Sequence, residues 1–228
     1  GNTVTGNTYP IYQGHSDPTY SGNDFSGNTN SVISVGGSLY QDVVWEDVQG
    51  LGLPYLVVSD VTVPSTRTLT IDGGVVVKFA YNSDYEYKRR LLVSGTLDLQ
   101  STPSQKVVFT SERDDTYGGD SNGDENATSP AADWGYIKYS NPNNVLHDAV
   151  IRYGGYRDDN EAQYSYDYRF YQVWVTGSGI GTLEIRDCVF EHARERAIYA
   201  DSSQAPSIHD NTISSSPYGI YLDGEGRV

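Results

Sequence analysis

The sequence predicts an all-β solenoid, in which short parallel strands coil turn upon turn. Three observations predict this fold class. Short runs rich in Val, Ile, Thr and Tyr, bounded by Gly, Asn, Asp and Pro, occur along most of the 228 residues. Similar segments recur about 22 to 23 residues apart near the C-terminal end. No Asn-Gly or Asp-Gly turn recurs at the regular spacing of a sandwich of hairpins.

Strand signals dominate most of the chain. The expected strands, in order, are residues 43–45, 55–58, 69–71, 75–79, 91–93, 107–110 and 136–139. One later segment, residues 191–200, has fair helix propensity in its Ala-Arg-Glu-Arg-Ala core. It has no helix cap and little apolar face, so we expect a turn followed by a strand there.

Internal repetition is clearest near the C-terminal end. Residues 185–190 align with residues 208–213, and residues 197–200 align with residues 219–222. A third copy, residues 146–151, stands 39 residues before the first, and a polar, Tyr-rich insertion accounts for the longer interval. Because a repeat of two or three short strands cannot bury its apolar face alone, successive repeats must stack as coils.

The predicted organisation is a single domain, residues 1–228, with about eight coils at this repeat length. Loop insertions are expected at about residues 112–133 and 153–170. The chain contains no Met and opens with Gly1, without a signal peptide. We therefore expect a mature region or a fragment of a longer protein, with neighbouring domains as partners.

The composition excludes several classes of function. The 15 Lys+Arg residues are outnumbered by 30 Asp+Glu, which excludes nucleic-acid binding through a basic footprint. Apolar runs are only a few residues long, so membrane insertion is not expected. The abundant Gly, scarce Lys and single Cys suit a turn-rich extracellular or cell-surface protein, in which Cys188 is a small buried apolar residue.

Residues 69–79, Leu-Thr-Ile-Asp-Gly-Gly-Val-Val-Val-Lys-Phe, are similar to a coil of right-handed parallel β-helix repeat proteins. These are secreted or surface proteins of bacteria and archaea, within the pectate-lyase-like superfamily. The resemblance covers about residues 55–222 and continues through residues 93–97, 107–111, 118–124, 133–135 and 151–155. It implies a right-handed parallel β-helix, a fold that carries lyases, hydrolases, adhesins and inert stalks.

The first insertion resembles half of a calcium loop. Oxygen-bearing side chains occupy alternate positions from residue 120 to residue 126, around Gly123, but Ala131 stands where an EF-hand has its final Glu. Other acids of the insertion could complete the shell. The candidate calcium ligands are Asp114, Asp120, Asn122, Asp124, Asn126 and Asp133. The alternative is a solvated acidic loop built on Asx-turns.

The second insertion is rich in Tyr. Its Tyr residues at positions 164, 166 and 168 alternate, so a strand would present all three on one face. Such a face could stack on sugar rings while charged neighbours bind hydroxyl groups. The candidate carbohydrate-binding residues are Tyr153, Tyr156, Arg157, Asp158, Tyr164, Tyr166 and Tyr168. The alternative is a flap whose rings pack over the outside of the solenoid.

No catalytic set stands out, and the catalytic residues are left unassigned. Paired acids at residues 114–115 and 158–159 lie in the expected loops, and the Arg-Ile-Lys motif of pectinolytic hydrolases on this fold is absent. A lyase would need calcium-binding Asp residues and an Arg base with specific partners. His147 and His209 occupy neighbouring positions in two repeat copies, with Arg186 between them, and we expect outward-facing structural side chains.

Three functions stay open. The favoured one is a non-catalytic extracellular module, a surface stalk or adhesive segment that binds polysaccharide or a cell-surface glycan through its Tyr-rich loop. The first alternative is a calcium-dependent polysaccharide lyase or glycoside hydrolase, favoured if acidic and basic side chains converge on one strand face. The second is a structural segment that self-associates at the solenoid ends, where sheet edges would be exposed.

Overall fold

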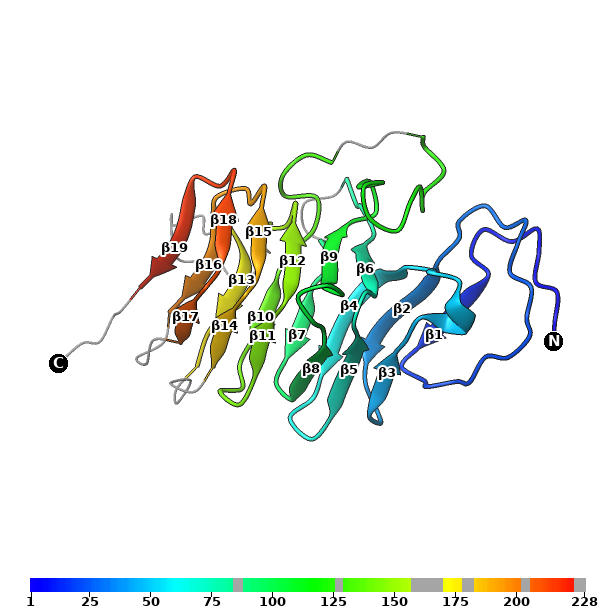
Figure 1. Ribbon diagram of the computed structural model, residues 1–228, viewed down its shortest axis with the longest axis horizontal. Helices are drawn as coiled ribbons and strands as arrows, with labels where there is room; N and C mark the ends of the chain where they lie inside the picture. The colour runs from blue at the N-terminus through cyan, green and yellow to red at the C-terminus, as the bar shows by residue number, and fades with distance from the viewer. Residues whose placement is uncertain (84–87, 126–128, 157–169, 178–182, 202–205, 224–228) are drawn as a thin grey trace.

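The computed structural model describes residues 1–83, 88–125, 129–156, 170–177, 183–201 and 206–223. Its strands lie side by side along one solenoid, from the N-terminal coil at one end to β19 at the other (Figure 1). All pairings between these strands are parallel, which confirms the predicted all-β parallel β-helix. Within the described ranges the one helical element is a 3₁₀ turn, η1 (Val48–Gly50), so no helix there could cross a membrane.

The strands form three stacks, here named A, B and C. Stack A contains β3 (Val43–Trp45), β5 (Thr68–Asp72), β8 (Thr96–Gln100), β11 (Val145–His147), β14 (Glu184–Arg186) and β17 (Ser207–His209). Stack B contains β1 (Ile11–Gly14), the first half of β2 (Ile33–Ser38), the first half of β4 (Tyr55–Val63), β6 (Val76–Phe79), β9 (Val107–Ser111), β12 (Ala149–Arg152), β15 (Val189–Glu191) and β18 (Thr212–Ser214). The end of β2 pairs with the second half of β4. Stack C contains the second half of β4, β7 (Leu91–Val93), β10 (Ile137–Tyr139), β13 (Tyr171–Val175), β16 (Arg196–Ala200) and β19 (Tyr218–Leu222).

One turn of the solenoid passes through stacks A, B and C in that order. β4 pairs with β6 through its first half and with β7 through its second half, which joins stacks B and C into one 13-stranded sheet. The repeats found in the sequence are such turns, because Ile185 pairs with Ile208 and Leu146 pairs with Ile185. Residues 191–200 contain the expected turn and strand, since β15 ends at Glu191 and β16 begins at Arg196.

An apolar column runs through the inside of stack B. Tyr55, Val77, Phe109, Ile151 and Phe190 pair in register from one turn to the next. Each is at most 1% exposed. Burial on this scale is the main stabilising contribution, at about 25 cal/mol for each Å² of apolar surface removed from water. The column also fixes the register, because a slip of one residue would turn these side chains outward.

The corners of the last turns repeat one backbone conformation. Asp148, Asp187 and Asp210, each between a stack A strand and a stack B strand, have φ values of 45°, 55° and 55°. Tyr153 and His192, directly after stack B strands, have φ values of 59° and 54°. An Asp tolerates this left-handed conformation because its short polar side chain can hydrogen-bond locally. Equal corners keep successive turns in register.

Buried asparagine amides satisfy backbone groups between turns. The Asn144 Oδ1 accepts a hydrogen bond from the Leu97 amide (2.8 Å), and its Nδ2 donates to the Gly95 carbonyl (3.0 Å). These bonds connect β8 to the β11 turn, where stack A divides into two three-stranded sheets. Asn211 accepts a hydrogen bond in the same way from the Cys188 amide (3.0 Å) of the turn before it. Buried backbone groups therefore find partners where strand pairing does not supply them.

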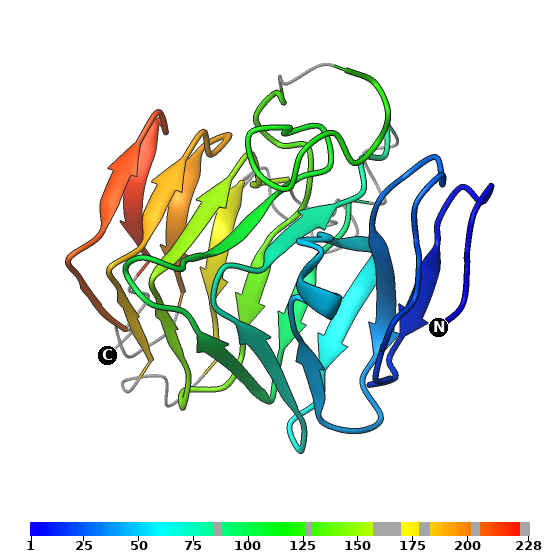
Figure 2. The same ribbon diagram turned by 45° about the vertical axis from the view of Figure 1, so that its right-hand side comes forward.

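Both insertions lie at the corner between stacks B and C. The first follows β9, and the second follows β12. Residues 112–125 and 129–133 rise over the outside of the solenoid at the same edge in two views (Figures 1 and 2). Any site built from both insertions therefore belongs to this corner.

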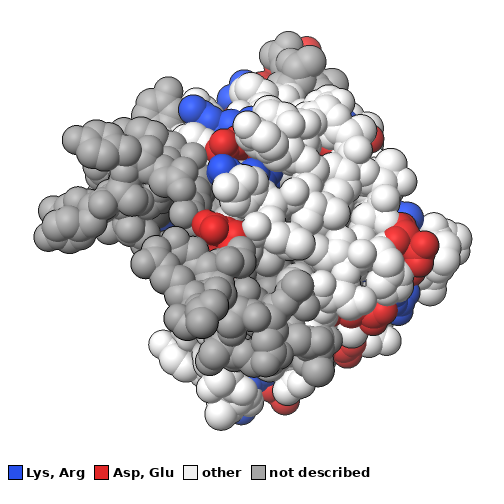
Figure 3. All heavy atoms as spheres, turned by 90° about the vertical axis from the view of Figure 1, so that its left-hand side faces the viewer, with Lys and Arg blue, Asp and Glu red and all other residues white. Residues whose placement is uncertain are grey.

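The turn of β17, β18 and β19 is much less buried than the turn before it. Ile220 and Leu222 of β19 are 46% and 55% exposed, whereas the residues that pair with them in β16, Ile198 and Ala200, are buried. Figure 3 looks onto this end, and much of the described surface there carries no charged side chain. The apolar core thus becomes accessible to solvent at the end of the described chain.

We expect Phe109→Ala to lower the free energy of unfolding by about 3–5 kcal/mol, because it opens a cavity in the apolar column. Denaturant unfolding followed by tyrosine and tryptophan fluorescence measures the change. Val44→Ala is the matched control, because Val44 lies on the exposed face of β3 and should change stability by about 0.5 kcal/mol or less. Equal losses in the two variants would contradict the assigned register.

Candidate functional site

The acidic insertion is fastened to the outer face of stack B by buried charges. Asp114 is fully buried and accepts hydrogen bonds from Arg152 Nη1 (3.0 Å) and Thr110 Oγ1 (2.6 Å). The Nζ of Lys78, also fully buried, donates to the Gly119 carbonyl (2.5 Å). Burial lowers the pKa of Lys78, and the surrounding carboxylates oppose that shift. Asp114, a predicted calcium ligand, is thus the partner of a buried arginine.

Asp133, another predicted calcium ligand, lies in a similar structural network. Its Oδ2 accepts hydrogen bonds from the hydroxyl groups of Ser111 (2.8 Å) and Ser129, and its Oδ1 lies 3.3 Å from Arg113 Nη1. Two hydroxyls and a guanidinium already satisfy this buried carboxylate. The structure therefore places Asp114 and Asp133 away from the exposed tip of the insertion. Asn126 lies outside the described residues.

The tip of the insertion gathers three carboxylates. Oxygen atoms of Asp115, Asp120 and Asp124 lie within 4.8 Å of one another. Burial and the nearby Asp120 raise the pKa of Asp115, whereas backbone amides, with Gly123 first, outweigh burial and lower the pKa of Asp120. Asn122 Nδ2 donates to Asp124 (2.8 Å). The predicted Asp120, Asn122 and Asp124 thus lie together. Asp115, one of the other acids of the insertion expected to complete the shell, joins them and offers a further oxygen ligand for a divalent cation.

The described tyrosines of the second insertion pack against the solenoid. The Tyr153 ring stacks on His192, with centroids 5.0 Å apart and an angle of 4° between the planes. Tyr156 is 8% exposed and contacts Phe170, with centroids 5.8 Å apart. Both rings therefore make packing contacts with the solenoid. The other candidates of this insertion, Arg157, Asp158, Tyr164, Tyr166 and Tyr168, lie outside the described residues.

An aromatic strip, which was not predicted from the sequence, covers the outer face of stack C. Tyr136, Tyr171, Tyr199 and Tyr221 follow one another from turn to turn, with centroid distances of 5.2, 5.2 and 5.8 Å. Trp174 lies 5.2 Å from Tyr171. One signal was available, because Tyr199 and Tyr221 hold the same position in two aligned repeats. The strip extends across four turns of the solenoid. Its rings at Tyr136, Tyr171 and Tyr199 are at most 3% exposed, so Trp174 and Tyr221 are the rings of the strip that reach solvent.

A groove of about 290 Å³ lies on stack A, and a second one of about 270 Å³, here called the stack C groove, lies beside the aromatic strip. The stack C groove is lined by Thr62, Arg90, Leu92, Val93, Ser94, Tyr136, Lys138 and Ser140. The Nζ of Lys138 lies 3.7 Å from the centroid of the Trp174 ring, a favourable cation–π geometry. Arg90 forms an ion pair with Asp60 at 2.6 Å. The groove thus combines hydroxyl groups, cations and an aromatic wall.

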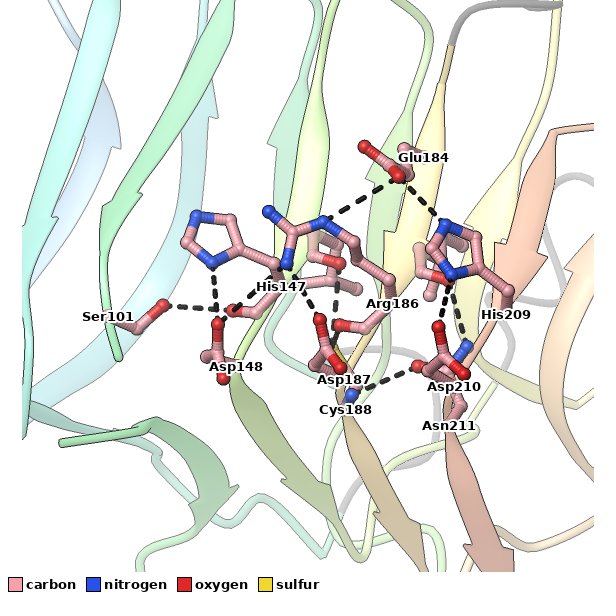
Figure 4. A network of polar contacts seen from close by, with 12 residues as sticks. Ser101, His147, Asp148, Glu184, Arg186, Asp187, Cys188, His209, Asp210 and Asn211 are labelled. Carbon is pink, nitrogen blue, oxygen red and sulfur yellow. Dashed lines mark hydrogen bonds and ion pairs between the residues drawn. The ribbon is translucent and has the colours of Figure 1, made fainter. Parts of the chain in front are cut away.

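A ladder of polar side chains crosses the outer face of stack A (Figure 4). His147, Arg186 and His209 pair in register across β11, β14 and β17. Each contacts the Asp that follows it in the chain, at 3.1, 2.7 and 2.7 Å. All three point outward and are held by neighbouring carboxylates, as expected for structural side chains. His147 and Arg186 also border the stack A groove.

His209 connects the turn of β17 to the turn before it. Its Nδ1 lies 2.7 Å from Asp210 Oδ2, and its Nε2 lies 2.8 Å from Glu184 Oε1 of β14 (Figure 4). These two carboxylates raise the pKa of His209. Both ring nitrogens can donate only when the ring is protonated, so the contact between the two turns is strongest in the imidazolium form.

Other groups considered for chemistry are engaged in structural contacts. Arg152 binds Asp114, and Arg196 Nη1 lies 2.9 Å from Glu195. Cys188 is 1% exposed, and burial raises the pKa of its thiol to about 12. The thiol is therefore protonated at neutral pH and is the small buried residue expected from the sequence.

No model of a known protein family matches the chain, and no curated protein or solved structure matches it. The parallel β-helix is shown by the strand pairing itself. Arguments about function therefore rest on the described residues and their contacts.

We expect the contact between β14 and β17 to weaken as the pH rises. Because the pKa of His209 is raised in the folded state, its contribution is fully present below the unfolded value of about 6.5 and is lost above the higher folded value. Hydrogen exchange of β17 amides at pH 5.5 and 8.5, corrected for intrinsic rates, measures the change. His209→Gln should abolish this dependence and the distant control His15→Gln should keep it; an unaltered dependence in His209→Gln would refute the role of His209.

Proposed function

We propose that this chain is a non-catalytic β-helix module of the extracellular space or cell surface, related to the pectate-lyase-like superfamily, which binds polysaccharide along the outer face of stack C. The observation that carries the proposal is the stack C groove together with the two solvent-accessible rings of the aromatic strip, Trp174 and Tyr221. Aromatic rings offer flat apolar faces with polar edges, which suit the faces and hydroxyl groups of sugars. The strip replaces the Tyr-rich loop as the main argument for glycan binding.

The shape of the surface favours an extended ligand. A volume of about 270 Å³ lies just below the usual range for sites that enclose a small ligand, so the groove suits one part of a longer chain. Tyr218 and Tyr221 of β19, 52% and 36% exposed, continue the aromatic surface beyond the groove. A polysaccharide lying across the strands of stack C would contact the groove and these rings in turn.

The lining of the groove favours binding over hydrolysis. None of the described side chains that line it is a carboxylate, whereas glycoside hydrolysis uses a pair of carboxylates flanking the bond that is cleaved. The nearby Asp60 is held by Arg90 Nε and Nη2 at 2.9 and 2.6 Å. The groove therefore offers contacts that orient a sugar and no described acid that would cleave it.

We expect Trp174→Ala to weaken binding to a polysaccharide by about tenfold, which corresponds to about 1.4 kcal/mol. Binding is measured by affinity electrophoresis against a panel of neutral and acidic polysaccharides and then by calorimetry with the best ligand. The matched control is Tyr12→Ala, because Tyr12 is 66% exposed on β1, outside stack C. An absence of binding to the whole panel, or equal binding by both variants, would reject the proposed surface.

A second proposal concerns calcium, and the cluster of Asp115, Asp120 and Asp124 favours it. A bound Ca²⁺ would relieve the repulsion between these carboxylates and hold the tip of the insertion. The buried Lys78, whose charge is attracted to Asp115 and Asp120, already neutralises part of that repulsion. The calcium site is therefore expected to stabilise the loop, with no role assigned in the stack C groove.

We expect Ca²⁺ at about 100 times its dissociation constant to raise the free energy of unfolding by about 2.7 kcal/mol. Thermal unfolding after EDTA treatment, with and without added calcium, measures the shift. Asp120→Asn should remove it, and Asp187→Asn, at the corner between stacks A and B, is the charge-matched control that should retain it. If calorimetry detects no calcium uptake by the unaltered protein, the proposal is wrong.

A further inference from the structure

A chemically reactive pair of residues, Asn122 and Gly123, lies at the tip of the first insertion. Asn122 is the sole Asn in the sequence that is followed by Gly. In such a pair the backbone nitrogen of the glycine can attack the side-chain carbonyl carbon of the asparagine, because glycine has no Cβ to shield that nitrogen. Neither residue belongs to a strand. The pair therefore lies outside the ladders that hold the backbone of the solenoid.

The fold favours glycine at position 123 and leaves it open to solvent. Gly123 has a φ of 74°, a left-handed conformation that glycine adopts without the strain a side chain would cause. A Cβ at this position would have no neighbour closer than the Thr29 carbonyl oxygen, 4.0 Å away. Gly123 is also exposed. Water and hydroxide can therefore reach the peptide group that reacts.

The contacts that hold this pair are local. The Gly123 amide donates to Asp120 Oδ1 at 2.7 Å. The Asn122 Nδ2 donates to Asp124 Oδ2 at 2.8 Å, and its Oδ1 accepts a hydrogen bond from the Asp124 amide at 3.3 Å. All these groups belong to residues 120–124, so the contacts can open without separating any strands. The backbone of the tip thus has the freedom that ring closure needs.

Asparagines at the corners of the solenoid are held differently. The Nδ2 of Asn144 donates to the Gly95 carbonyl at 3.0 Å, and that of Asn211 donates to the Ile185 carbonyl at 2.8 Å. Each of these bonds joins two turns. A Val and a Thr follow these asparagines, and their branched side chains shield the next backbone nitrogen. These side-chain amides are therefore expected to persist where that of Asn122 does not.

We propose that Asn122 is a site of spontaneous deamidation, which irreversibly changes the charge of the acidic insertion. After hydroxide removes the proton of the Gly123 nitrogen, this nitrogen forms a bond to Cγ of Asn122. The bond from Cγ to Nδ2 breaks, and ammonia leaves with a proton taken from water. Water then opens the cyclic imide at either carbonyl, which gives aspartate or isoaspartate. No oxidant or reductant takes part, and the reaction needs neither calcium nor a glycan.

The product replaces a hydrogen-bond donor with a negative charge. The Asn122 Nδ2 now donates to Asp124, and a carboxylate oxygen in its place would repel that side chain. Oxygen atoms of Asp115, Asp120 and Asp124 already lie within 4.8 Å of one another, so a further carboxylate adds to their repulsion. Isoaspartate also adds a carbon to the backbone, which moves the neighbouring groups out of their present contacts. Deamidation therefore loosens the tip as the protein ages.

Incubation of the full chain in EDTA, at neutral and at mildly alkaline pH, tests the assignment. Peptide mapping by mass spectrometry should find the side-chain amide of Asn122 replaced by a carboxyl group, sooner at alkaline pH, and isoaspartyl methyltransferase should label the same peptide. Asn30, which is 9% exposed and is followed by Ser, is the internal control and should keep its amide. Asn122→Gln should abolish the conversion, because the longer side chain closes a less favourable ring.

A synthetic peptide of residues 118–125 gives the rate of the unprotected reaction. If the peptide converts while Asn122 of the folded chain keeps its amide, the fold protects the pair and the inference is overturned. Thermal unfolding in EDTA tests the effect on the tip. Asn122→Asp should unfold at a lower temperature than Asn122→Ser, because both lose the Nδ2 donor and only the aspartate adds a charge, and salt should reduce the difference. Equal unfolding temperatures at low salt would overturn the loosening of the tip.

Discussion

In-register stacking of apolar side chains from turn to turn is the constraint on which the rest of this molecule depends. Parallel pairing aligns Val77 under Tyr55 and Phe109 under Val77, and each next turn repeats the arrangement. A strand of three residues would be unstable alone, but β10 and β14, for example, are each paired with a neighbour on both sides and buried on the inner face. The equal corners at Asp187 and Asp210 exist because a change in corner length would break this alignment.

The same constraint decides where the chain can vary. Extra residues cannot enter a strand without a change of register, so they accumulate at the corner between stacks B and C. Buried charges then fasten the first insertion, as the contacts of Lys78 with Gly119 and of Arg152 with Asp114 show. The outward side chains are free of the packing constraint. For this reason the aromatic strip and the polar ladder occupy different faces of one core.

The sequence contained enough information for the fold and for part of the candidate sites. The alignment of Ile185 with Ile208 predicted the pairing of β14 with β17, because the intervening turn has the basic repeat length. The second insertion separates Tyr136 from Tyr171, so their contact on stack C could not be found from the repeat spacing.

The positions of side chains within the acidic insertion could not be predicted from the sequence pattern alone. Asp114 and Asp115 are adjacent, yet the structure buries the first against Arg152 and places the second beside Asp120. Alternating positions predicted that Asp120 and Asp124 would lie together, because that contact is local.

The most direct test of the proposed binding surface is the change in backbone amide chemical shifts when ¹⁵N-labelled protein is titrated with oligosaccharides of the polysaccharide that binds best. The proposed function predicts changes in β7, β10 and β13 around the stack C groove, with the amides of β3, β5 and β8 unchanged. Changes confined to stack A, or no change at saturating oligosaccharide, would contradict a ligand surface on stack C.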